Sequence, residues 1–332
     1  MRQLVLGVDA GGTSSRAALF TVDGAPVGRG HAPGANPVTL GMDRACAHLT
    51  AAVQEAAASS LPHVSAVVVG LAGNPRACRE LAERVLRPLL PQGPPVRVVG
   101  DTVTAFAAGT SAPSGTVLIS GTGAIAAKIT DHEQTATADG YGWLLGDEGS
   151  GFWLGHAAAR ATIRALAAPQ PPSSCPPAPI RPPTPATALA KGHAADGRLA
   201  VLVVRQLLPE GVGEDPVARL AGAVHDRPPL ALAELAPLVS QAAEAGDPVA
   251  QALVAEAAAR LASTAAQVHE PGLPIVLAGG VLTAEGPVKR AVHDLLADAV
   301  TSGDAANGAA WLAARDLLPE AEARARHAAF TA

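Results

Sequence analysis

Two glycine-rich turns about 110 residues apart are the first places in this chain that could do chemistry. The first spans 9–16 (DAGGTSSR) and the second spans 120–123 (SGTG), and each lies between two apolar runs. Backbone N–H groups in such a turn can donate to phosphate oxygens, because glycine has no side chain to hold the anion away. The residues that we predict to bind phosphate are Gly11, Gly12, Thr13, Ser14, Gly121, Thr122 and Gly123.

A single turn of this kind could equally be a hairpin turn with a polar tip. The second copy, in the same strand–turn–strand context, favours the phosphate hypothesis because a chance glycine turn seldom recurs in this way. Neither turn has the G-x-x-x-x-G-K-[ST] pattern of a P-loop. Each also leads into a predicted strand, whereas the glycines of a dinucleotide-binding fingerprint lead into a helix. The two commonest nucleotide folds are therefore disfavoured.

Two aspartates stand where a carboxylate would serve phosphate chemistry. Asp9 ends the first apolar run, where it could hold Mg²⁺ through water. Asp101 follows the apolar run 96–99 and begins a predicted helix. Aspartate is a favoured N-cap residue, so a capping role and a catalytic role are both open for Asp101 on its position alone.

Aromatic residues gather in one segment of a chain that has few of them. Of the three tryptophans, one tyrosine and four phenylalanines, four lie close together: Tyr141, Trp143, Phe152 and Trp153. Aromatic rings pack against the C–H faces of sugars, and a carboxylate such as that of Asp147 accepts hydrogen bonds from hydroxyl groups. The alternative is that the rings wedge a loop into the core, which we expect at least for Trp153.

The surrounding pattern predicts the elements that must position these residues. Apolar runs predict strands at 3–9, 16–22, 64–70, 96–99, 115–120, 124–129 and 274–278. Helical spacing predicts helices at 43–59, 76–88, from 101 onward, 187–207, 216–225, 230–245, 248–268, 287–300 and 307–316, with no strand between the last two. The repeated strand–turn–strand unit implies two similar halves that face one another. The proline-rich stretch 169–185 predicts an extended surface insertion.

Composition limits the possible partners. The chain has 332 residues, of which 48% are hydrophobic and 16% charged, so it can form two globular domains. No apolar run has the length of a membrane span, and a net charge of −5 gives no basic stripe, so we expect neither a membrane nor a nucleic acid as partner. The N-terminus resembles no secretion signal, and we expect a cytoplasmic protein. The three cysteines are far apart, without the spacing of a zinc or iron–sulfur site.

Taken together, these motifs resemble a known superfamily. The ordered set 9–16, 67–73, Asp101, 120–123 and 278–281 resembles the sugar kinase, Hsp70 and actin superfamily. Within it, the run 140–153 (GYGWLLGDEGSGFW) resembles the N-acetylglucosamine kinases of the BadF/BadG/BcrA/BcrD ATPase group. The resemblance implies an α/β fold of two actin-like (ribonuclease H-like) domains with a nucleotide cleft between them. We expect domains at 1–112 and at 113–312, the latter with the insertion 169–185, and a helix within 313–332 that returns to the first domain.

The resemblance also implies an activity and a set of site residues. It implies transfer of the γ-phosphoryl group of ATP, with Mg²⁺ near Asp9, to an amino sugar. The acceptor that it implies is the 6-hydroxyl of N-acetylglucosamine, with Asp101 as the base. It places Gly279 and Gly280 beside the adenosine, with Thr283 and Ala233 as further candidates. It implies a homodimer, and it places these residues at the sugar: Asn36, Asp101, Gly140, Tyr141, Gly142 and Asp147.

Other functions remain open on the sequence. Glucosamine, N-acetylmannosamine or another hexose could be the acceptor, since a few pocket contacts decide between such sugars. An ATPase activator of an acyl-CoA dehydratase shares this group's fold, but its cysteine-bound iron–sulfur cluster is poorly matched by Cys46, Cys78 and Cys175. A non-catalytic sensor would not need the base that Asp101 supplies. A zinc-containing repressor-and-kinase protein would show a clustered Cys/His motif, which this sequence lacks.

Overall fold

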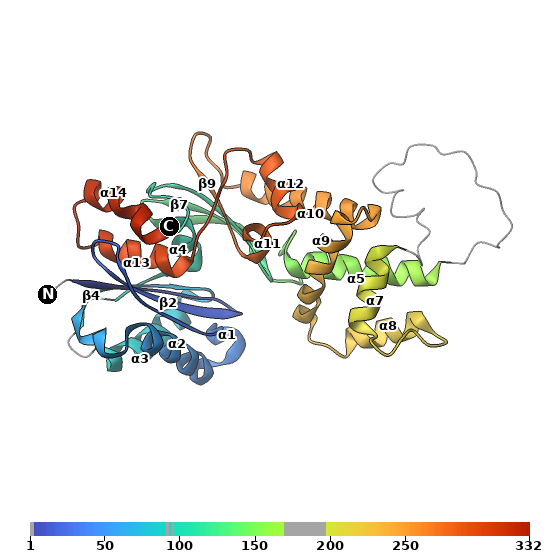
Figure 1. Ribbon diagram of the computed structural model, residues 1–332, viewed down its shortest axis with the longest axis horizontal. Coiled ribbons are helices and arrows are strands. Elements are labelled where there is room, and N and C mark those ends of the chain that lie inside the picture. The colour runs from blue at the N-terminus through green and yellow to red at the C-terminus, as the bar shows by residue number, and fades with distance from the viewer. Residues whose placement is uncertain (1–2, 91–92, 95, 169–196) are drawn as a thin grey trace.

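The computed structural model describes residues 3–90, 93–94, 96–168 and 197–332 (Figure 1). Its first sheet has the order β3-β2-β1-β4-β5. Strands β1, β2 and β3 form an antiparallel meander, and β4 and β5 add to β1 in parallel. The bounds are β1 Leu4–Ala10, β2 Ser14–Thr21, β3 Pro26–Pro33, β4 Val64–Leu71 and β5 Val96–Gly100.

The second sheet repeats this topology. Its order is β10-β9-β6-β7-β8, with an antiparallel meander of β6, β7 and β8 and with β9 and β10 added in parallel. The bounds are β6 Gly115–Ser120, β7 Ala124–Thr130, β8 Glu133–Asp139, β9 Ile275–Ala278 and β10 Val300–Thr301. The fold is therefore α/β with two similar halves, and the internal duplication expected from the two glycine turns is confirmed.

Helices cover both faces of the first sheet. Successive side chains of β1 point to opposite faces of the sheet. Leu6 and Val8 point to one face and pack in an apolar cluster with α2 (Met42–Ala57) and α3 (Pro75–Leu89). Val5 points the other way, into a cluster with α4 (Asp101–Ala107) and α13 (Ala305–Arg315). Burial on both faces explains why β1 is an almost continuous apolar run. The short α1 (Pro37–Leu40) and the 3₁₀ helix η1 (Ala58–His63) flank α2.

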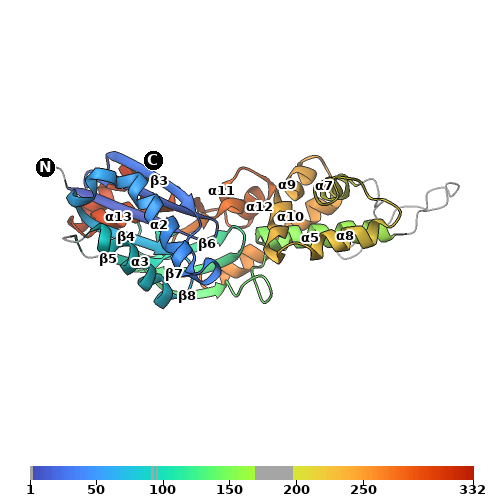
Figure 2. The same cartoon turned by 90° about the horizontal axis from the view of Figure 1, so that it is seen from below.

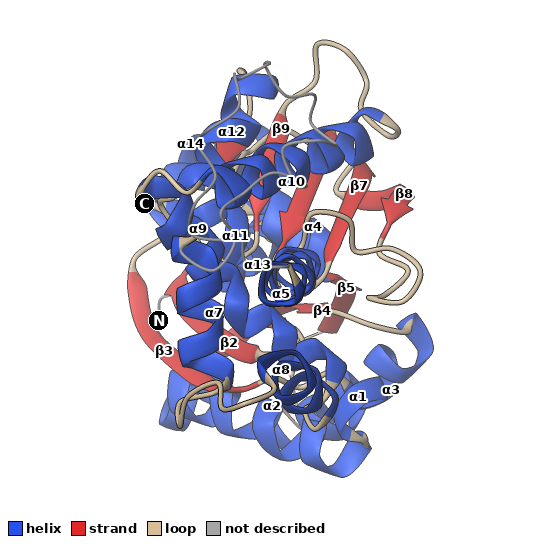
Figure 3. Ribbon diagram, turned by 90° about the vertical axis from the view of Figure 1, so that its right-hand side faces the viewer, coloured by secondary structure: helices blue, strands red, loops and turns tan. Residues whose placement is uncertain are grey.

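The second half carries most of the remaining helices. They are α5 (Gly151–Ala167), α7 (Arg198–Leu207), α8 (Pro216–His225), the 3₁₀ helix η2 (Pro229–Leu235), α9 (Ala236–Glu244), α10 (Pro248–Ala266), α11 (Gly280–Thr283) and α12 (Pro287–Leu295). Figure 2 shows α5, α7, α8 and α9 extending from the second sheet away from the first. Figure 3 looks onto this helical end, with α5 and α8 in front of both sheets. Leucine, valine and alanine side chains of these helices form one cluster with β6 and β9.

The chain returns to the first half at its C-terminus. Helix α13 packs against β1 and β4, and α14 (Glu320–Thr331) packs against α13. The Phe330 ring lies 5.0 Å from that of Phe20 on β2, and the buried Trp311 donates from Nε1 to the Ala323 carbonyl at 2.8 Å. Residue 312, the expected end of the second domain, thus lies within α13. The division of the chain into domains stays a prediction.

The structure corrects several expected elements. Strands β3, β8 and β10 were not expected, and β10 lies between the two C-terminal helices where no strand was predicted. The expected helix 230–245 begins as η2 and becomes α-helical only at Ala236, and the expected helix 287–300 ends at Leu295. The insertion 169–185 and the first part of the expected helix 187–207 lie outside the described residues. Among the helices that are described, none is both long and apolar enough to cross a bilayer.

Candidate active site

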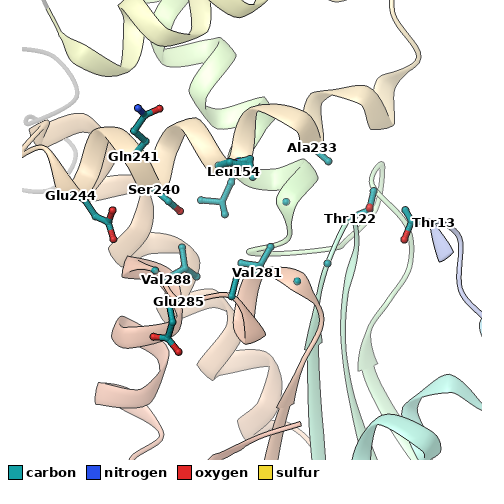
Figure 4. A pocket seen from close by; sticks show the side chains of 17 residues that line it. Thr13, Thr122, Leu154, Ala233, Ser240, Gln241, Glu244, Val281, Glu285 and Val288 are labelled. Carbon is teal, nitrogen blue, oxygen red and sulfur yellow. The ribbon is translucent and has the colours of Figure 1, made fainter. Parts of the chain in front are cut away.

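Residues of both glycine turns line one cavity of about 530 Å³, to which the first half contributes Thr13 and the second half the rest of the wall. Figure 4 shows Thr13 and Thr122 side by side at one end of this cavity. Of the residues expected to bind nucleotide, those that line it are Thr13, Gly121, Thr122, Ala233 and Gly280. The others stand in the same turns or next to them without lining the cavity: Gly11, Gly12, Ser14, Gly123, Gly279 and Thr283. The roles of all these residues stay predictions.

The rest of the cavity wall comes from helices that the motif analysis did not single out. One face of α9 supplies Ser240, Gln241 and Glu244, and α12 with the preceding loop supplies Glu285 and Val288 (Figure 4). Both glutamates are paired, Glu244 with Arg290 at 3.1 Å and Glu285 with Lys289. The lining residues not already named are Gly151, Leu154, Ala236, Pro237, Val281, Ala284 and Gly286. The cavity therefore runs from the threonine hydroxyls to a polar, partly acidic far end.

Hydrogen bonds fix the second glycine turn to the start of α5. The backbone N–H of Gly151 donates to the Gly121 carbonyl at 2.8 Å, and that of Phe152 donates to the Thr122 carbonyl at 3.1 Å. Gly279 packs directly onto this turn, with φ of +82°, and a Cβ there would lie 2.4 Å from the Ser120 carbonyl oxygen. Only glycine fits such a position without strain. The turn expected to contact adenosine and the turn expected to contact phosphate therefore form one rigid unit.

The first glycine turn is packed just as closely. The backbone N–H of Gly11 donates to the Ser14 carbonyl at 3.0 Å, and that of Ala35 donates to the Gly11 carbonyl at 3.0 Å. A Cβ on Gly34 would lie 2.2 Å from the Gly12 carbonyl oxygen, so the chain after β3 lies directly against the turn. The segment that leads to Asn36 is thus tied to the first turn.

Asp101 is the first residue of α4, and the structure places Gly100, not Asp101, at the N-cap. Asp101 is therefore not the N-cap residue, and Gly100, which is, has no side chain that could cap the helix. Burial raises the pKa of the Asp101 carboxyl, and a hydrogen bond from the backbone N–H of Thr102 partly opposes the shift. A carboxylate with a raised pKa is a stronger base than an unperturbed one and is better suited to accept a proton.

Asp9 is the last residue but one of β1 and lies close to Asp101. Burial, together with the negative charges of Asp101 and Asp304, raises the pKa of the Asp9 carboxyl to about 7. The Thr104 hydroxyl donates to Asp9 Oδ1 at 2.7 Å, and this hydrogen bond, with the positive charge of Arg16, acts in the opposite direction. The two acids expected at the centre of the chemistry are thus electrostatically coupled.

The acidic pair suits a magnesium ion that is held mainly by phosphate and water. Mg²⁺ is commonly bound through one or two carboxylates together with substrate phosphates, so a complete protein cage is not needed. Within the described part of the chain, no group of three or more His, Cys, Asp or Glu side chains is arranged to hold a metal. Asp9, beside the first glycine turn, fits the sparse donor set that Mg²⁺ with a nucleotide requires.

On the sugar side, the structure gives Asn36 a local role. Asn36 is the N-cap of α1 and accepts from the backbone N–H of Val38 at 2.9 Å. Gly73, after β4, lies against the same amide group, since a Cβ there would come 3.2 Å from Asn36 Oδ1. Asn36 is therefore held in a fixed orientation at the ends of β3 and β4, on the same edge of the first sheet as Asp101.

Asp147 is buried, with φ of +58°, and its side chain points to the second glycine turn. Its Oδ1 accepts from the backbone N–H of Ala124 at 3.2 Å, and a Cβ on Gly123 would lie 2.8 Å from its Oδ2. Burial raises the pKa of this carboxyl. The loop itself is folded by Asp139, whose carboxylate accepts from the backbone N–H groups of Gly140, Asp147 and Glu148 at 2.7 to 2.8 Å.

The aromatic residues divide between the core and the surface. Trp153 packs against the core of the second half, as expected, and the guanidinium of Arg260 lies 5.1 Å from its ring centre. Arg260 also pairs with Glu148, which ties the loop to α10. Tyr141 is 67% exposed and Trp143 is 40% exposed, so both rings are open to a ligand on one side, while that of Trp143 also packs 5.5 Å from the ring of Phe152. Gly140 and Gly142 both have positive φ, +76° and +84°, and shape the turn that carries Tyr141.

Two sheets of identical topology, with glycine turns that meet at one cavity, define an actin-like ATPase fold. The chain belongs to the BadF/BadG/BcrA/BcrD ATPase family, whose family model matches residues 6–309.

Individual relatives agree with this assignment. The chain is 34% identical over 108 residues to the N-acetylmuramic acid/N-acetylglucosamine kinase of Clostridium acetobutylicum, a match that covers 32% of this chain and 35% of the relative. The match thus spans about a third of that relative's length. A structure from Chromobacterium violaceum, described as a proposed N-acetylglucosamine kinase, is 26% identical with a TM-score of 0.67 and covers 94% of this chain and 99% of its own. A second, from Porphyromonas gingivalis, is 19% identical with a TM-score of 0.65, covers 95% of this chain and 100% of its own, and supports the fold.

Proposed function

We propose that this protein is an ATP-dependent sugar kinase that phosphorylates an amino sugar, N-acetylglucosamine, at its 6-hydroxyl. The observation that carries the proposal is the cavity that Thr13 and Thr122 share, with Asp9 at the end of β1 beside the first turn and Asp101 close to Asp9. Membership of the ATPase family and the kinase names of two relatives support the same activity.

In the proposed reaction backbone N–H groups of both turns hold the β- and γ-phosphates of ATP. The N–H groups of Gly11 and Gly121 already donate within the turns, to the Ser14 and Gly123 carbonyls, so the donors to phosphate are the N–H groups of the residues that follow them. When bound, Mg²⁺ neutralises phosphate charge, and Asp9 is the side chain that would hold it, through water. The adenosine occupies the part of the cavity bordered by Ala233 and Gly280. In such a reaction the protein mainly positions the reactants and stabilises charge.

Asp101 accepts the proton of the sugar 6-hydroxyl as the O6–phosphorus bond forms and the bond from the γ-phosphorus to the bridging oxygen of ADP breaks. The products are the sugar 6-phosphate and ADP. Asn36, Gly140, Tyr141, Gly142 and Asp147 surround the sugar in this proposal. Because Asp147 also accepts from Ala124, the first residue of β7 after the second turn, its carboxylate links the sugar loop to the phosphate turn.

The proposal extends to the state of the protein in the cell. It includes Mg²⁺ as the metal, a cytoplasmic location and a homodimer, all of which rest on the resemblance to kinases of this group. Light scattering on the purified protein tests the dimer, since a homodimer has twice the mass of one chain.

The test of function is ADP release from Mg-ATP by the purified protein with N-acetylglucosamine, glucosamine, N-acetylmannosamine or glucose. We expect turnover that depends on the sugar and is highest with N-acetylglucosamine. The Asp101→Asn variant should lose it, whereas Asp298→Asn, an exposed aspartate after α12, serves as the matched control. Preference for another sugar would reassign the substrate. ATP hydrolysis that ignores every sugar would refute the kinase proposal and favour an ATPase activator.

A further inference from the structure

Thr104 on α4 contacts both Asp9 and Asp101, and the proposed function gives it no role. Its side chain is fully buried, one helical turn after Asp101. Its hydroxyl lies 2.7 Å from Asp9 Oδ1 and 2.9 Å from the backbone carbonyl oxygen of Asp101. A single hydroxyl thus contacts both the carboxylate at the end of β1 and the residue that begins α4.

Other buried helical threonines show what an ordinary structural role looks like. A threonine hydroxyl in a helix commonly bonds to a carbonyl three or four residues earlier. Thr162 does this with Ala158 at 2.9 Å, and Thr264 does it with Arg260 at 3.1 Å. The Thr104 hydroxyl lies at the same kind of distance from the Asp101 carbonyl, but its single hydrogen is shared with Asp9 Oδ1, a carboxylate acceptor that Thr162 and Thr264 do not have. Hydrogen bonds to charged groups are the stronger ones.

Two glycines of neighbouring elements pack closely against Thr104, one against its side chain and one against its backbone. On one side, a Cβ on Gly70 of β4 would lie 2.4 Å from both Oγ1 and Cγ2 of Thr104. On the other side, a Cβ on Gly308 of α13 would lie 2.4 Å from the Thr104 carbonyl oxygen. Gly70 does not have a positive φ, so its backbone conformation does not require glycine. The space that Gly70 leaves open is filled by the Thr104 side chain.

We propose that Thr104 is a positioning residue for phosphoryl transfer, whose hydroxyl holds the Asp9 carboxylate in the orientation needed for the metal–nucleotide complex and in fixed relation to Asp101. The inference rests on the proposed function and extends it by one residue. The branched Cβ of threonine has few χ1 rotamers, and the close approach of Gly70 to Oγ1 and Cγ2 confines it further, so the hydroxyl is aimed at Asp9 before any ligand binds. Valine has the same shape and lacks the donor.

The first test measures binding, so that it does not depend on turnover. The affinity for a non-hydrolysable ATP analogue is determined by calorimetry with and without Mg²⁺ in wild type, Thr104→Val, Thr104→Ser and the matched control Thr162→Val. We expect Mg²⁺ to strengthen binding in wild type and Thr162→Val alike. In Thr104→Val this strengthening should fall by about tenfold, the effect expected for loss of one hydrogen bond to a charged group. Thr104→Ser, which keeps the hydroxyl, should recover most of it.

The second test displaces the Thr104 side chain by a substitution at the neighbouring Gly70. Gly70→Ala should displace the Thr104 side chain and reduce the Mg²⁺ effect, as Thr104→Val does. In the Thr104→Ala background the added methyl of Gly70→Ala meets fewer atoms, and it should cause little further loss. Thermal unfolding of each variant shows which of them fold. If Thr104→Val does not fold, the binding measurement on Gly70→Ala decides the test.

The outcomes separate this inference from the proposed function. An unchanged Mg²⁺ effect in Thr104→Val, or in Gly70→Ala if only that variant folds, overturns the role of Thr104. A wild type that binds the Mg–nucleotide complex but phosphorylates no sugar refutes the kinase proposal, while the binding series still decides the role of Thr104. Steady-state kinetics adds a further check, because a positioning role predicts a higher Mg²⁺ requirement in Thr104→Val with little change in the KM for the sugar.

Discussion

Replacing Asp9 with asparagine should stabilise the nucleotide-free protein and abolish its use of Mg-ATP. Folding raises the pKa of the Asp9 carboxyl from 3.8 to about 7, through burial and the negative charges of Asp101 and Asp304. Each pKa unit corresponds to about 1.4 kcal/mol, so ionised Asp9 costs the folded state up to about 4 kcal/mol. Solvent around this partly buried carboxylate screens the charges, and we expect a gain of about 2 to 4 kcal/mol in Asp9→Asn above pH 8.

The sign of the pH dependence follows from proton binding. Between the unfolded pKa of 3.8 and the folded pKa of about 7, the folded protein keeps the Asp9 proton more often than the unfolded chain does. The contribution of Asp9 to stability therefore falls as the pH rises through this window, and its full cost is present above the folded pKa. Asparagine does not ionise, so the advantage of the variant should shrink at lower pH, to about half or less at pH 5.

Urea denaturation without nucleotide or divalent cation measures this effect at pH 5 and pH 8. Wild type, Asp9→Asn and the exposed control Asp298→Asn are compared, with the control expected to match wild type at both pH values. A variant no more stable than wild type at pH 8 would refute the electrostatic reasoning, as would a gain of equal size at both pH values. A more stable but inactive Asp9→Asn protein would show that the site retains Asp9 at the expense of stability.

Two further substitutions test how the turns and the sugar loop are held. Gly279→Ala places a Cβ 2.4 Å from the Ser120 carbonyl oxygen at a φ of +82°. We expect steady-state kinetics to show a rise of about tenfold or more in the KM for ATP, and thermal unfolding to show a lower melting temperature. An unchanged KM would mean that the two turns move independently. Asp139→Asn removes the charge from a carboxylate that accepts hydrogen bonds from three backbone N–H groups. Steady-state kinetics should therefore show a KM for the sugar that is about tenfold higher, and an unaltered KM would contradict the role given to Asp139.

The parts of the fold that the sequence predicts well are the buried strands and the glycine turns. Strands β1, β4, β6, β7 and β9 are apolar runs because they lie inside the sheets. Strands β3 and β8 are the outer strands of the two meanders, and most of their residues are exposed. An edge strand with polar residues carries little apolar periodicity, and a strand of two residues such as β10 carries none.

The residues of the candidate site also divide into those that the sequence predicts and those that it does not. Thr13, Gly121 and Thr122 are recognisable because their chemistry is local to a turn. Ser240 and Glu244 join the cavity only because α9 packs over the second half, and four-residue spacing of polar residues on a helix is common on any surface.

Two other residues show what local spacing can and cannot reveal. The spacing of Thr104, three residues after Asp101, places both on one face of a helix and could have drawn attention to it. The contact of Asp147 with Ala124 depends on the left-handed conformation of Asp147, which sequence does not show.

The most direct test of the central claim is identification of the product that the protein forms from Mg-ATP and N-acetylglucosamine. Phosphorus and carbon NMR of the reaction mixture distinguishes a phosphate on O6 from one on another hydroxyl or from free phosphate. The account predicts N-acetylglucosamine 6-phosphate with wild type and with Asp298→Asn, and none with a folded Asp101→Asn. Free phosphate without a sugar phosphate, or undiminished product from Asp101→Asn, would contradict it.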